Sequence, residues 1–238
     1  MIKKAVIVAA GCSSRLYPRT LDFPKPLLPL RNKTLLEQSV EHLQTFGVQS
    51  IAVVIGYKSE QIRGALSGYG EGIHFVENPF YAHCNNMGSL WFAREFIGRE
   101  RFLYLHGDIA YSPTILEPLL HDSSEGTLGR MLVDYGPTDE ESMKVKVDAN
   151  QNLVASSKEI PFKEAAGEWT GIAEFSEPDL VFDMFDRFLM AGKLNCYDTA
   201  AFTELCKLHK IQCPDVNGLP WIEIDFESDY QRAMKLFP

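Results

Sequence analysis

A phosphate-binding loop is indicated by small and basic residues near the start of the chain. An apolar run at residues 5–10 ends at Gly11, and a loop with two serines and Arg15 follows it. Lys25 stands between two prolines, which restrict the backbone around it and so help to aim its side chain. Small residues let backbone N–H groups approach an anion, and arginine and lysine supply positive charge against it. The pattern predicts a strand that opens into a phosphate-binding loop; an ordinary surface loop is the alternative.

Three carboxylates lie at or near the ends of two later apolar runs. Asp108 follows the run at residues 101–106 after one glycine, and Asp225 ends another run with Glu223 two residues before it. Alternation along a strand puts Glu223 and Asp225 on the same face. Magnesium is usually held by one or two carboxylates together with water and substrate phosphates. The residues therefore predict a Mg²⁺ site if the two strands are neighbours; the alternative is that Asp108 forms a turn and Asp225 caps the last helix.

Aromatic residues in the second half of the chain have carboxylates beside them. They are Tyr135, Trp169, Tyr197 and Trp221, with Asp134, Glu168 and Asp198 next to the first three. Aromatic faces with nearby carboxylates suit a cationic group such as a choline or an amine. Core or lid packing is the alternative, and a neutral sugar 1-phosphate or an aminoalkyl phosphonate could use a similar pocket.

The elements that must position these residues alternate between strand and helix in the first half. Strands are expected at 5–10, 50–55, 73–76 and 101–106. Helices are expected from Thr34, which begins a capping box with Glu37, at 59–66, at 87–97 and from Pro113. This order predicts a mainly parallel sheet, which binds ligands beyond the carboxyl ends of its strands. The polar groups after residues 10, 55, 76 and 106 all fall at such ends.

The pattern changes beyond about residue 125. Strands are expected at 127–135, 144–147, 153–157 and 169–175, followed by helices at 178–191 and 199–209. The chain then closes with a strand at 221–225 and a helix at 227–236. The acidic segment 137–142 is expected to be an exposed loop. No repeat or clear linker divides the chain.

Composition excludes several classes of protein. The chain has 238 residues, 45% of them hydrophobic, which suits one large α/β domain with or without a small lid. A net charge of −9 argues against a nucleic-acid binder. No apolar run approaches the roughly 20 residues of a membrane helix. The five cysteines form no Cys-x-x-Cys pair, which favours reduced thiols in a cytoplasmic protein. We expect the protein to be a monomer or a homodimer.

The loop motif resembles the signature of the sugar-nucleotidyltransferase superfamily. That signature is Gly-x-Gly-x-Arg-Leu-x-Pro-x-Thr followed by Pro-Lys-Pro-Leu, and here residues 11–20 and 24–27 match it in order. Ser13 stands where the family often has glycine, which bears on how closely the backbone meets the triphosphate. The late segment 221–230, with residues 78–81, 85–86 and 89–90, looks like the bacterial choline-phosphate cytidylyltransferases, which are MobA-like NTP transferases.

The resemblance implies a Rossmann-like nucleotide-diphospho-sugar transferase fold, an α/β/α sandwich around a mainly parallel mixed sheet with a small acceptor-binding lid. It implies one domain over residues 1–238, with a nucleotide-binding part at 1–125, an acceptor-binding part at about 126–214 and a closing strand and helix at 215–238. It also implies transfer of a nucleotidyl group from a nucleoside triphosphate to a phosphorylated acceptor, with Mg²⁺ and release of pyrophosphate.

The resemblance further implies roles for individual residues. Arg15 would hold the β- and γ-phosphates, Lys25 the α-phosphate, and Lys158 the acceptor phosphate. The nucleotide-binding set is Ala9, Ala10, Gly11, Cys12, Ser13, Ser14, Arg15, Lys25, Asn85, Ser89, Gly107 and Asp108. The metal set is Asp108, Glu223 and Asp225. The acceptor-binding set is Lys158, Glu168, Trp169, Gly171, Tyr197 and Asp198.

Three functions stay open from the sequence. The first is a cytidylyltransferase that moves CMP from CTP to phosphocholine or an aminoalkyl phosphonate, and the resemblance favours it. The second is a sugar-1-phosphate nucleotidyltransferase that makes an NDP-sugar for a cell-surface polysaccharide. The third is a nucleotide-binding relative without activity, which the joint presence of Arg15, Lys25, Asp108 and Asp225 disfavours.

Overall fold

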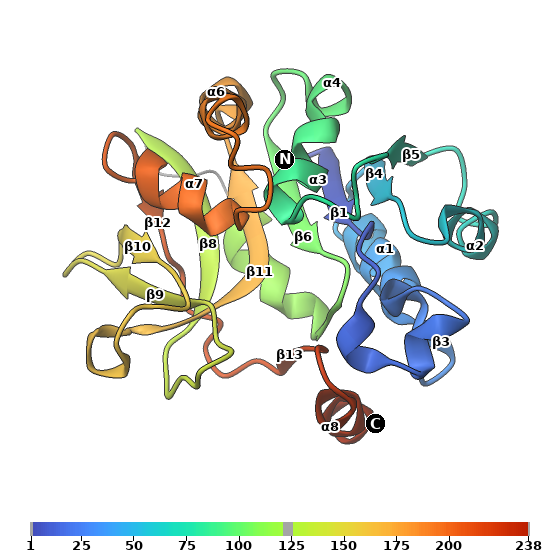
Figure 1. Cartoon of the computed structure of the whole chain (residues 1–238). Coiled ribbons are helices and arrows are strands. Elements are labelled where there is room, and N and C mark those ends of the chain that lie inside the picture. The colour runs from blue at the N-terminus through green and yellow to red at the C-terminus, as the bar shows by residue number, and fades with distance from the viewer. Residues whose placement is uncertain (1, 121–125, 238) are drawn as a thin grey trace.

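The central sheet is built from the apolar runs of the first half of the chain. In the computed structural model, which describes residues 2–120 and 126–237, strands β5, β4, β1 and β6 lie side by side in that order and run parallel (Figure 1). Their bounds are Lys4–Val8 for β1, Ser50–Ile55 for β4, Ile73–Glu77 for β5 and Phe102–His106 for β6. All five residues of β6 are buried because helices cover both faces of the sheet there.

The second half of the chain continues the same sheet with mostly antiparallel strands. Strand β11 pairs with β6, β8 and β9, while β10 pairs with β9 and β12 runs parallel to β8. The bounds are Thr127–Asp134 for β8, Lys144–Val147 for β9, Leu153–Ser156 for β10, Gly167–Phe175 for β11 and Lys210–Gln212 for β12. Within the described residues the sheet thus has nine strands. The predicted α/β fold with a mainly parallel central sheet is confirmed.

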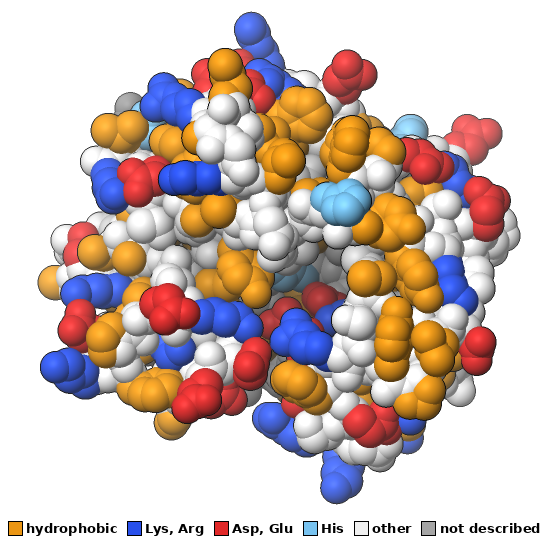
Figure 2. All heavy atoms as spheres, in the orientation of Figure 1, with side chains coloured by type: hydrophobic (Ala, Val, Ile, Leu, Met, Phe, Trp, Pro, Cys, Tyr) orange, Lys and Arg blue, Asp and Glu red, His pale blue; other side chains and the backbone are white. Residues whose placement is uncertain are grey.

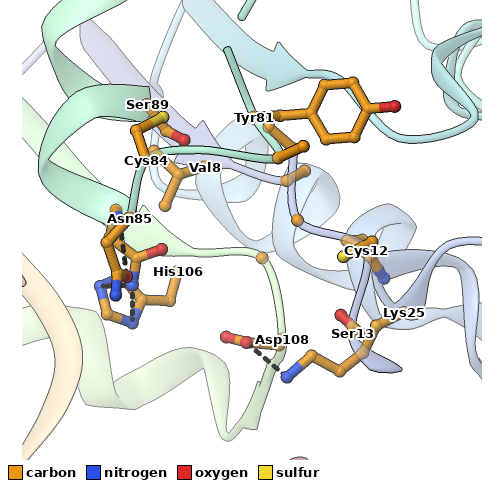
Figure 3. A pocket seen from close by; sticks show the side chains of 17 residues that line it. Val8, Cys12, Ser13, Lys25, Tyr81, Cys84, Asn85, Ser89, His106 and Asp108 are labelled. Atoms are coloured by element: carbon orange, nitrogen blue, oxygen red, sulfur yellow. Dashed lines mark hydrogen bonds and ion pairs between the residues drawn. The ribbon is translucent and has the colours of Figure 1, made fainter. Parts of the chain in front are cut away.

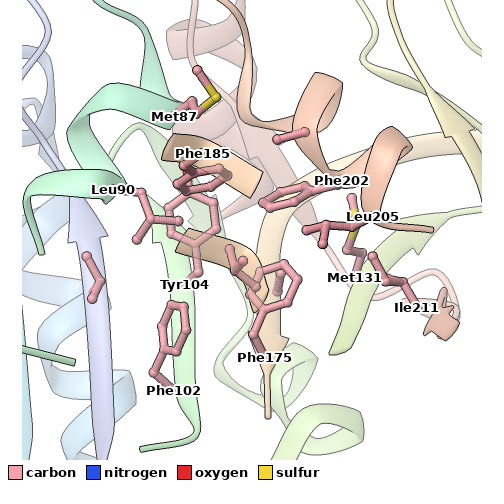
Figure 4. Close-up of a cluster of buried hydrophobic side chains, with 14 of the residues drawn as sticks. Met87, Leu90, Phe102, Tyr104, Met131, Phe175, Phe185, Phe202, Leu205 and Ile211 are labelled. Atoms are coloured by element: carbon pink, nitrogen blue, oxygen red, sulfur yellow. The ribbon is translucent and has the colours of Figure 1, made fainter. Parts of the chain in front are cut away.

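Helices pack on both faces of the sheet, as alternation along the strands requires. Alternate side chains of β1 and β6 enter two separate cores, so that Val6 and Tyr104 lie in one while Ile7 and Leu105 lie in the other. The first core is covered by α3 Asn86–Phe92, α4 Arg94–Ile97, α6 Pro178–Met190 and α7 Asp198–Leu205. The second is covered by α1 Leu35–Thr45, α2 Ser59–Ala65 and α5 Glu117–Leu120. Figure 4 shows the first core, where Tyr104 lies among Phe185, Phe202 and Phe175.

Short elements join the phosphate loop to the end of the chain. Strand β13 Trp221–Glu223 pairs with β7 Ile109–Tyr111, and helix α8 Glu227–Leu236 follows. A third small core, which includes Leu16, Leu28, Ile224 and Tyr230, packs α8 against the loop segment (Figure 1). The other short elements are β2 Pro29–Leu30, β3 Lys33–Thr34 and the 3-10 turns Ser14–Leu16, Arg19–Leu21, Lys25–Leu27, Pro113–Leu116 and Phe162–Glu164.

Most expected elements are present, and the differences concern their ends. The capping box of Thr34 and Glu37 is confirmed, since each side chain accepts from the backbone N–H of the other. The helix expected at 87–97 is two helices with a break at Ala93. The last strand ends at Glu223 instead of 225, and the helix expected at 199–209 ends at Leu205, after which the unexpected strand β12 begins. Strands of three residues, such as β7 and β12, are too short to show a hydrophobic period.

No helix within residues 2–120 and 126–237 is long and apolar enough to cross a membrane. The proposed division into a nucleotide-binding and an acceptor-binding part stays a prediction, and its boundary at residue 125 lies outside the described residues.

Candidate active site

The predicted site lies where the parallel strands end. The loop after β1, the segment that follows β5 and the Gly107 turn after β6 all lie at one edge of the sheet, where they border a cavity of about 290 Å³. Its lining contains most of the predicted nucleotide set, namely Ala9, Ala10, Gly11, Cys12, Ser13, Lys25, Asn85, Ser89, Gly107 and Asp108. Gly107 is needed for this approach, because a Cβ there would lie 2.7 Å from the carbonyl oxygen of Val8. Ser14 and Arg15 are not in the lining, although they follow Ser13 in the same loop.

The cavity has a charged end and a neutral end. Lys25 and Asp108 face each other at one end, whereas Ser89, Cys84 and Tyr81 lie at the other (Figure 3). In the space-filling view the molecule is hollowed at this place, with basic and acidic side chains gathered along one rim (Figure 2). This polarity matches a nucleoside triphosphate, whose phosphates carry the charge and whose base does not.

The phosphate loop adopts a backbone conformation that favours glycine. Ser13 has φ 51° and ψ 48°, in the left-handed region, where a side chain is strained. The hydroxyl of Thr20 donates to the Ser13 carbonyl at 2.9 Å and holds the turn. This left-handed conformation explains why the resembled family often has glycine at this position. In this chain Ser13 adopts the same kind of conformation.

Lys25 is the buried cation of the site. It is 6% exposed, and its Nζ lies 2.7 Å from Asp108 Oδ2 and 2.9 Å from Asp225 Oδ1. Burial alone lowers the pKa of Lys25, but the charges of Asp108, Asp225 and Glu223 outweigh it and raise that pKa. The ammonium therefore stays charged. Arg15 joins the same group from the loop, with its guanidinium 2.9 Å from Asp225 Oδ2.

Asp108 and Asp225 lie close together because of the short sheet that the sequence did not reveal. Strand β13 pairs with β7, and the backbone N–H of Ile224 donates to the Asp108 carbonyl at 3.0 Å. Asp229 accepts from the backbone N–H of Asp225 at 3.2 Å and fixes the turn after β13. The predicted juxtaposition of the two aspartates is thus present.

The carboxylates also offer a place for a divalent cation. Ligand atoms of His106, Asp108 and Glu223 lie within 4.8 Å of one another, and Asp108 Oδ1 is buried without a hydrogen-bond partner among the described residues. An unpartnered carboxylate oxygen beside a second carboxylate fits a hard cation. Asp225, although predicted as a ligand, has both oxygens engaged by Lys25 and Arg15 and is not a member of this group.

The environment of Glu223 and His106 is strongly charged. Burial and the charges of Asp108 and Asp225 raise the pKa of Glu223 to about 7. Burial lowers the pKa of His106, but its hydrogen bond with Asp198 and the nearby carboxylates raise it to about 9. At neutral pH the His106 imidazole is therefore protonated, while Glu223 is present in both its protonated and its ionised form.

A smaller hollow of about 40 Å³ adjoins the cavity and shares Asn86 and His106 with it. Five of the six predicted acceptor residues line it, namely Lys158, Trp169, Gly171, Tyr197 and Asp198, together with Arg15. Gly171 has φ 78°, and a Cβ there would lie 2.9 Å from His106 Nδ1. The exposed Glu141 crosses the entrance, with Oε2 3.0 Å from Lys158 Nζ and 3.4 Å from the Arg15 guanidinium.

Four residues of the predicted acceptor pocket do not line this hollow, namely Asp134, Tyr135, Glu168 and Trp221. Glu168 alternates with Trp169 along β11 and is absent from the lining. The Tyr135 hydroxyl donates to the Cys213 carbonyl at 2.8 Å, and Trp221 Nε1 donates to Asp134 at 2.9 Å. These aromatic residues pack and bond within the fold, so the structure gives them no place at the hollow.

Asp198 is fully buried and already satisfied by the protein. It accepts from the Tyr104 hydroxyl at 2.5 Å and from the Thr199 N–H at 2.8 Å, and His106 Nε2 lies 3.2 Å away. Its charge therefore faces the imidazolium at the floor of the hollow. Tyr197, in contrast, is 41% exposed and offers its ring at the entrance.

Sequence reasoning missed His106, Asn86 and Glu141. His106 is the polar residue that ends an otherwise apolar strand beside Gly107, which was a readable signal. Asn86, which entered the sequence analysis through the resemblance but was given no site role, lies with its amide nitrogen 3.2 Å from His106 Nε2. Glu141 was expected only as part of an exposed loop, and no local pattern marks its contact with Arg15, 126 residues away.

Comparisons with known proteins show the family and the fold of the chain. Residues 5–135 match the MobA-like NTP transferase domain. The chain is 30% identical over 97% of its length to the CMP-5'-(3-aminopropyl)phosphonate synthase of Streptomyces rubellomurinus, of which it spans only 38%. It is 26% identical to the CTP:phosphoglutamine cytidylyltransferase of Campylobacter jejuni, with 95% of this chain and 97% of that protein covered. The solved CTP:phosphocholine cytidylyltransferase of Streptococcus pneumoniae has the same fold, with a TM-score of 0.80, 21% identity and full coverage of both chains.

Proposed function

Because the chain belongs to the MobA-like NTP transferase domain family, we propose that it is a nucleotidyltransferase that moves CMP from CTP to a small phosphorylated acceptor and releases pyrophosphate. The observation that carries the proposal is the buried Lys25, whose Nζ lies within 3 Å of both Asp108 and Asp225 at the charged end of the cavity. The acceptor belongs to the phosphocholine or aminoalkyl phosphonate class. Two relatives support this class of reaction, one named as a synthase of a CMP-linked aminopropyl phosphonate and the other as a CTP:phosphoglutamine cytidylyltransferase.

The reaction needs positioning and charge neutralisation more than acid–base chemistry. A phosphate monoester has a second pKa of about 6 and is mostly a dianion at pH 7. Its oxygen attacks the α-phosphorus of CTP, the new P–O bond forms, and the bond to the pyrophosphate oxygen breaks, so no proton has to be removed. The protein must hold two anions in line and offset their repulsion.

The basic side chains divide this work. Arg15, which lines the second hollow, binds the β- and γ-phosphates, and Lys25, which lines the first, contacts the α-phosphate where charge develops. Lys158 binds the acceptor phosphate from the second hollow. Ser89 and the backbone of Ala10 and Gly11 bind the base at the neutral end of the first.

A magnesium ion fits the carboxylate group. Asp108 and Glu223 would hold it, with Asp225 as a third candidate, and the ion would supply further neutralisation of the phosphate charge. Lys25 is held in place by ion pairs with Asp108 and Asp225, so its position does not depend on the ion.

The cationic part of the acceptor would rest against Trp169 and Tyr197. Aromatic contact with a desolvated cation contributes roughly 0.5–2 kcal/mol. Because Asp198 is already paired with His106 and Glu223 is assigned to the metal ion, the aromatic faces are the groups left to favour a positive head.

The test is pyrophosphate release over a grid of nucleotides and acceptors. We expect phosphocholine or aminoethyl phosphonate to exceed glucose 1-phosphate by about tenfold or more in kcat/KM with CTP. Tyr197→Ala should remove most of that preference while CTP binding persists, and the exposed Tyr17→Ala is a matched control outside both hollows. A preference for the sugar phosphate would assign the chain to sugar-1-phosphate transfer instead.

A further inference from the structure

We propose that Asn78 fixes the direction of the Ser89 hydroxyl and thereby makes the site select cytosine over uracil. The proposal rests on the proposed function only in placing the base beside Ser89. Asn78 does not itself line the cavity, so it is a positioning residue that acts through Ser89.

The orientation of the Asn78 amide is set by the backbone. The N–H of Phe80 can only donate, and it lies 2.9 Å from one terminal atom of the amide, which must therefore be the oxygen Oδ1. The other atom, Nδ2, then points at Ser89 Oγ at 3.1 Å and at Cys84 Sγ at 3.2 Å. Asn78 is 1% exposed, and its own N–H donates to the Ile55 carbonyl at 2.8 Å, so the side chain has little freedom to turn.

This contact occupies one of the two lone pairs of the Ser89 hydroxyl and so favours the hydroxyl as a donor to a ligand. Nδ2 donates to Ser89 Oγ, and among the described residues no protein acceptor takes the proton of that hydroxyl. Ser89 is 7% exposed and lines the neutral end of the cavity, beside Cys84 and Tyr81 (Figure 3). The proton is therefore available to the cavity, and Ser89 presents a hydrogen-bond donor to the base.

A donor at this position distinguishes the two pyrimidines. Cytosine has an unprotonated N3, which accepts a hydrogen bond, whereas N3 of uracil carries a hydrogen and can only donate. A hydroxyl that points its proton toward N3 bonds cytosine and opposes uracil. Sites built around such a polar contact discriminate more strongly than apolar pockets, because the mismatched pair leaves buried polar groups unpaired.

The decisive variant is Asn78→Asp, which keeps the shape but replaces the donor Nδ2 with an acceptor. One carboxylate oxygen still accepts from the Phe80 N–H, and the other accepts from the Ser89 hydroxyl, whose proton is thereby turned away from the cavity. We expect the ratio of Kd for UTP to Kd for CTP, about tenfold or more in the unmodified chain, to fall to about one or below. Both nucleotides carry the same triphosphate, so any repulsion from the new carboxylate cancels in the ratio.

Three further variants separate positioning from general damage. Ser89→Ala should also abolish the preference, and in that background Asn78→Asp should change the ratio no further. Asn32→Asp makes the same chemical change at an exposed turn and should leave the ratio unchanged. If the Asp variant does not fold, Asn78→Ala replaces it, with an expected loss of at least threefold in the preference because the hydroxyl is no longer oriented.

Titration calorimetry with CTP and UTP measures binding without turnover, so a failure of the proposed transfer reaction leaves this test intact. Equal binding of CTP and UTP by the unmodified chain, or a CTP preference that survives Asn78→Asp or its Ala replacement, would overturn the proposal. Additive effects of the Asn78 and Ser89 changes would likewise show that Asn78 does not act through the hydroxyl.

Discussion

Gly171 offers a direct test of how the floor of the acceptor hollow is held. It lies in β11 where the pairing with β8 shifts register, and its φ of 78° is one that side chains rarely adopt. An added Cβ would also lie 2.9 Å from His106 Nδ1 and 3.0 Å from Cγ. His106 cannot easily yield, because Asp198 contacts its Nε2 and the Trp169 ring packs against it at 4.8 Å. Gly171→Ala should therefore add strain and displace the imidazole.

The size of the effect follows from two separate costs. The left-handed backbone costs an alanine about 1–2 kcal/mol, and overpacking a buried contact costs about 1–3 kcal/mol more. We expect a loss of roughly 3 kcal/mol in the free energy of unfolding, which for a chain of this size lowers Tm by roughly 6–12 °C. Displacement of His106 by a fraction of an ångström should also lower kcat/KM for the acceptor by about tenfold, with nucleotide binding less affected.

Gly192→Ala is the matched control. Gly192 has φ 74°, but nothing lies within 4 Å of its added Cβ, so only the backbone strain of about 1–2 kcal/mol should appear. Thermal unfolding and acceptor kinetics of both variants separate strain from contact. Equal losses of Tm in the two variants, with unchanged acceptor kinetics in Gly171→Ala, would refute the argument that His106 is pressed against β11.

Three other predictions concern the charged groups. Lys25→Ala should lower kcat at least about a hundredfold while changing the Kd for nucleotide little, whereas Arg15→Ala should weaken nucleotide binding. Calorimetry measures the Kd for nucleotide and a turnover assay measures kcat, so the two effects can be told apart. Glu141→Gln should lower KM for the acceptor about two- to fivefold, because this exposed carboxylate competes with phosphate for Lys158 and Arg15; an increased KM would contradict this. The raised pKa of Glu223, about 7 against an ordinary value near 4.5, means that stability is lost as pH rises through that interval. Glu223→Gln should thus raise the free energy of unfolding by roughly 1–3 kcal/mol at pH 8 without divalent cations and leave it unchanged at pH 4.5. Denaturant titrations of both proteins at the two pH values measure this difference.

The local signals in the sequence determined much of the nucleotide half. Apolar runs that end in glycine, the capping box of Thr34 and Glu37, and Lys25 between prolines are set by neighbouring residues, and the central parallel sheet follows from their order. The strand ends then had to meet on one edge, because parallel strands share a direction. This is why the sequence alone predicted that Gly11 and Asp108 lie at one edge of the sheet, whereas Lys25 was assigned to the site by its setting between prolines and by the family resemblance.

The tertiary structure alone decided which groups neutralise one another. Asp225 is brought to Lys25 by the short pairing of β13 with β7. A metal ion bound by Asp225, as predicted, would have to compete with Lys25 and Arg15 for its carboxylate oxygens. His106 meets Asp198, 92 residues away, in a core where burial magnifies every charge. Glu168 was assigned to the acceptor pocket by its neighbour Trp169, but alternation along β11 removes it from the lining. The contacts of Asp225 with Lys25 and of His106 with Asp198 depend on distance in space and not on spacing along the chain, which is why no local pattern revealed these pairs.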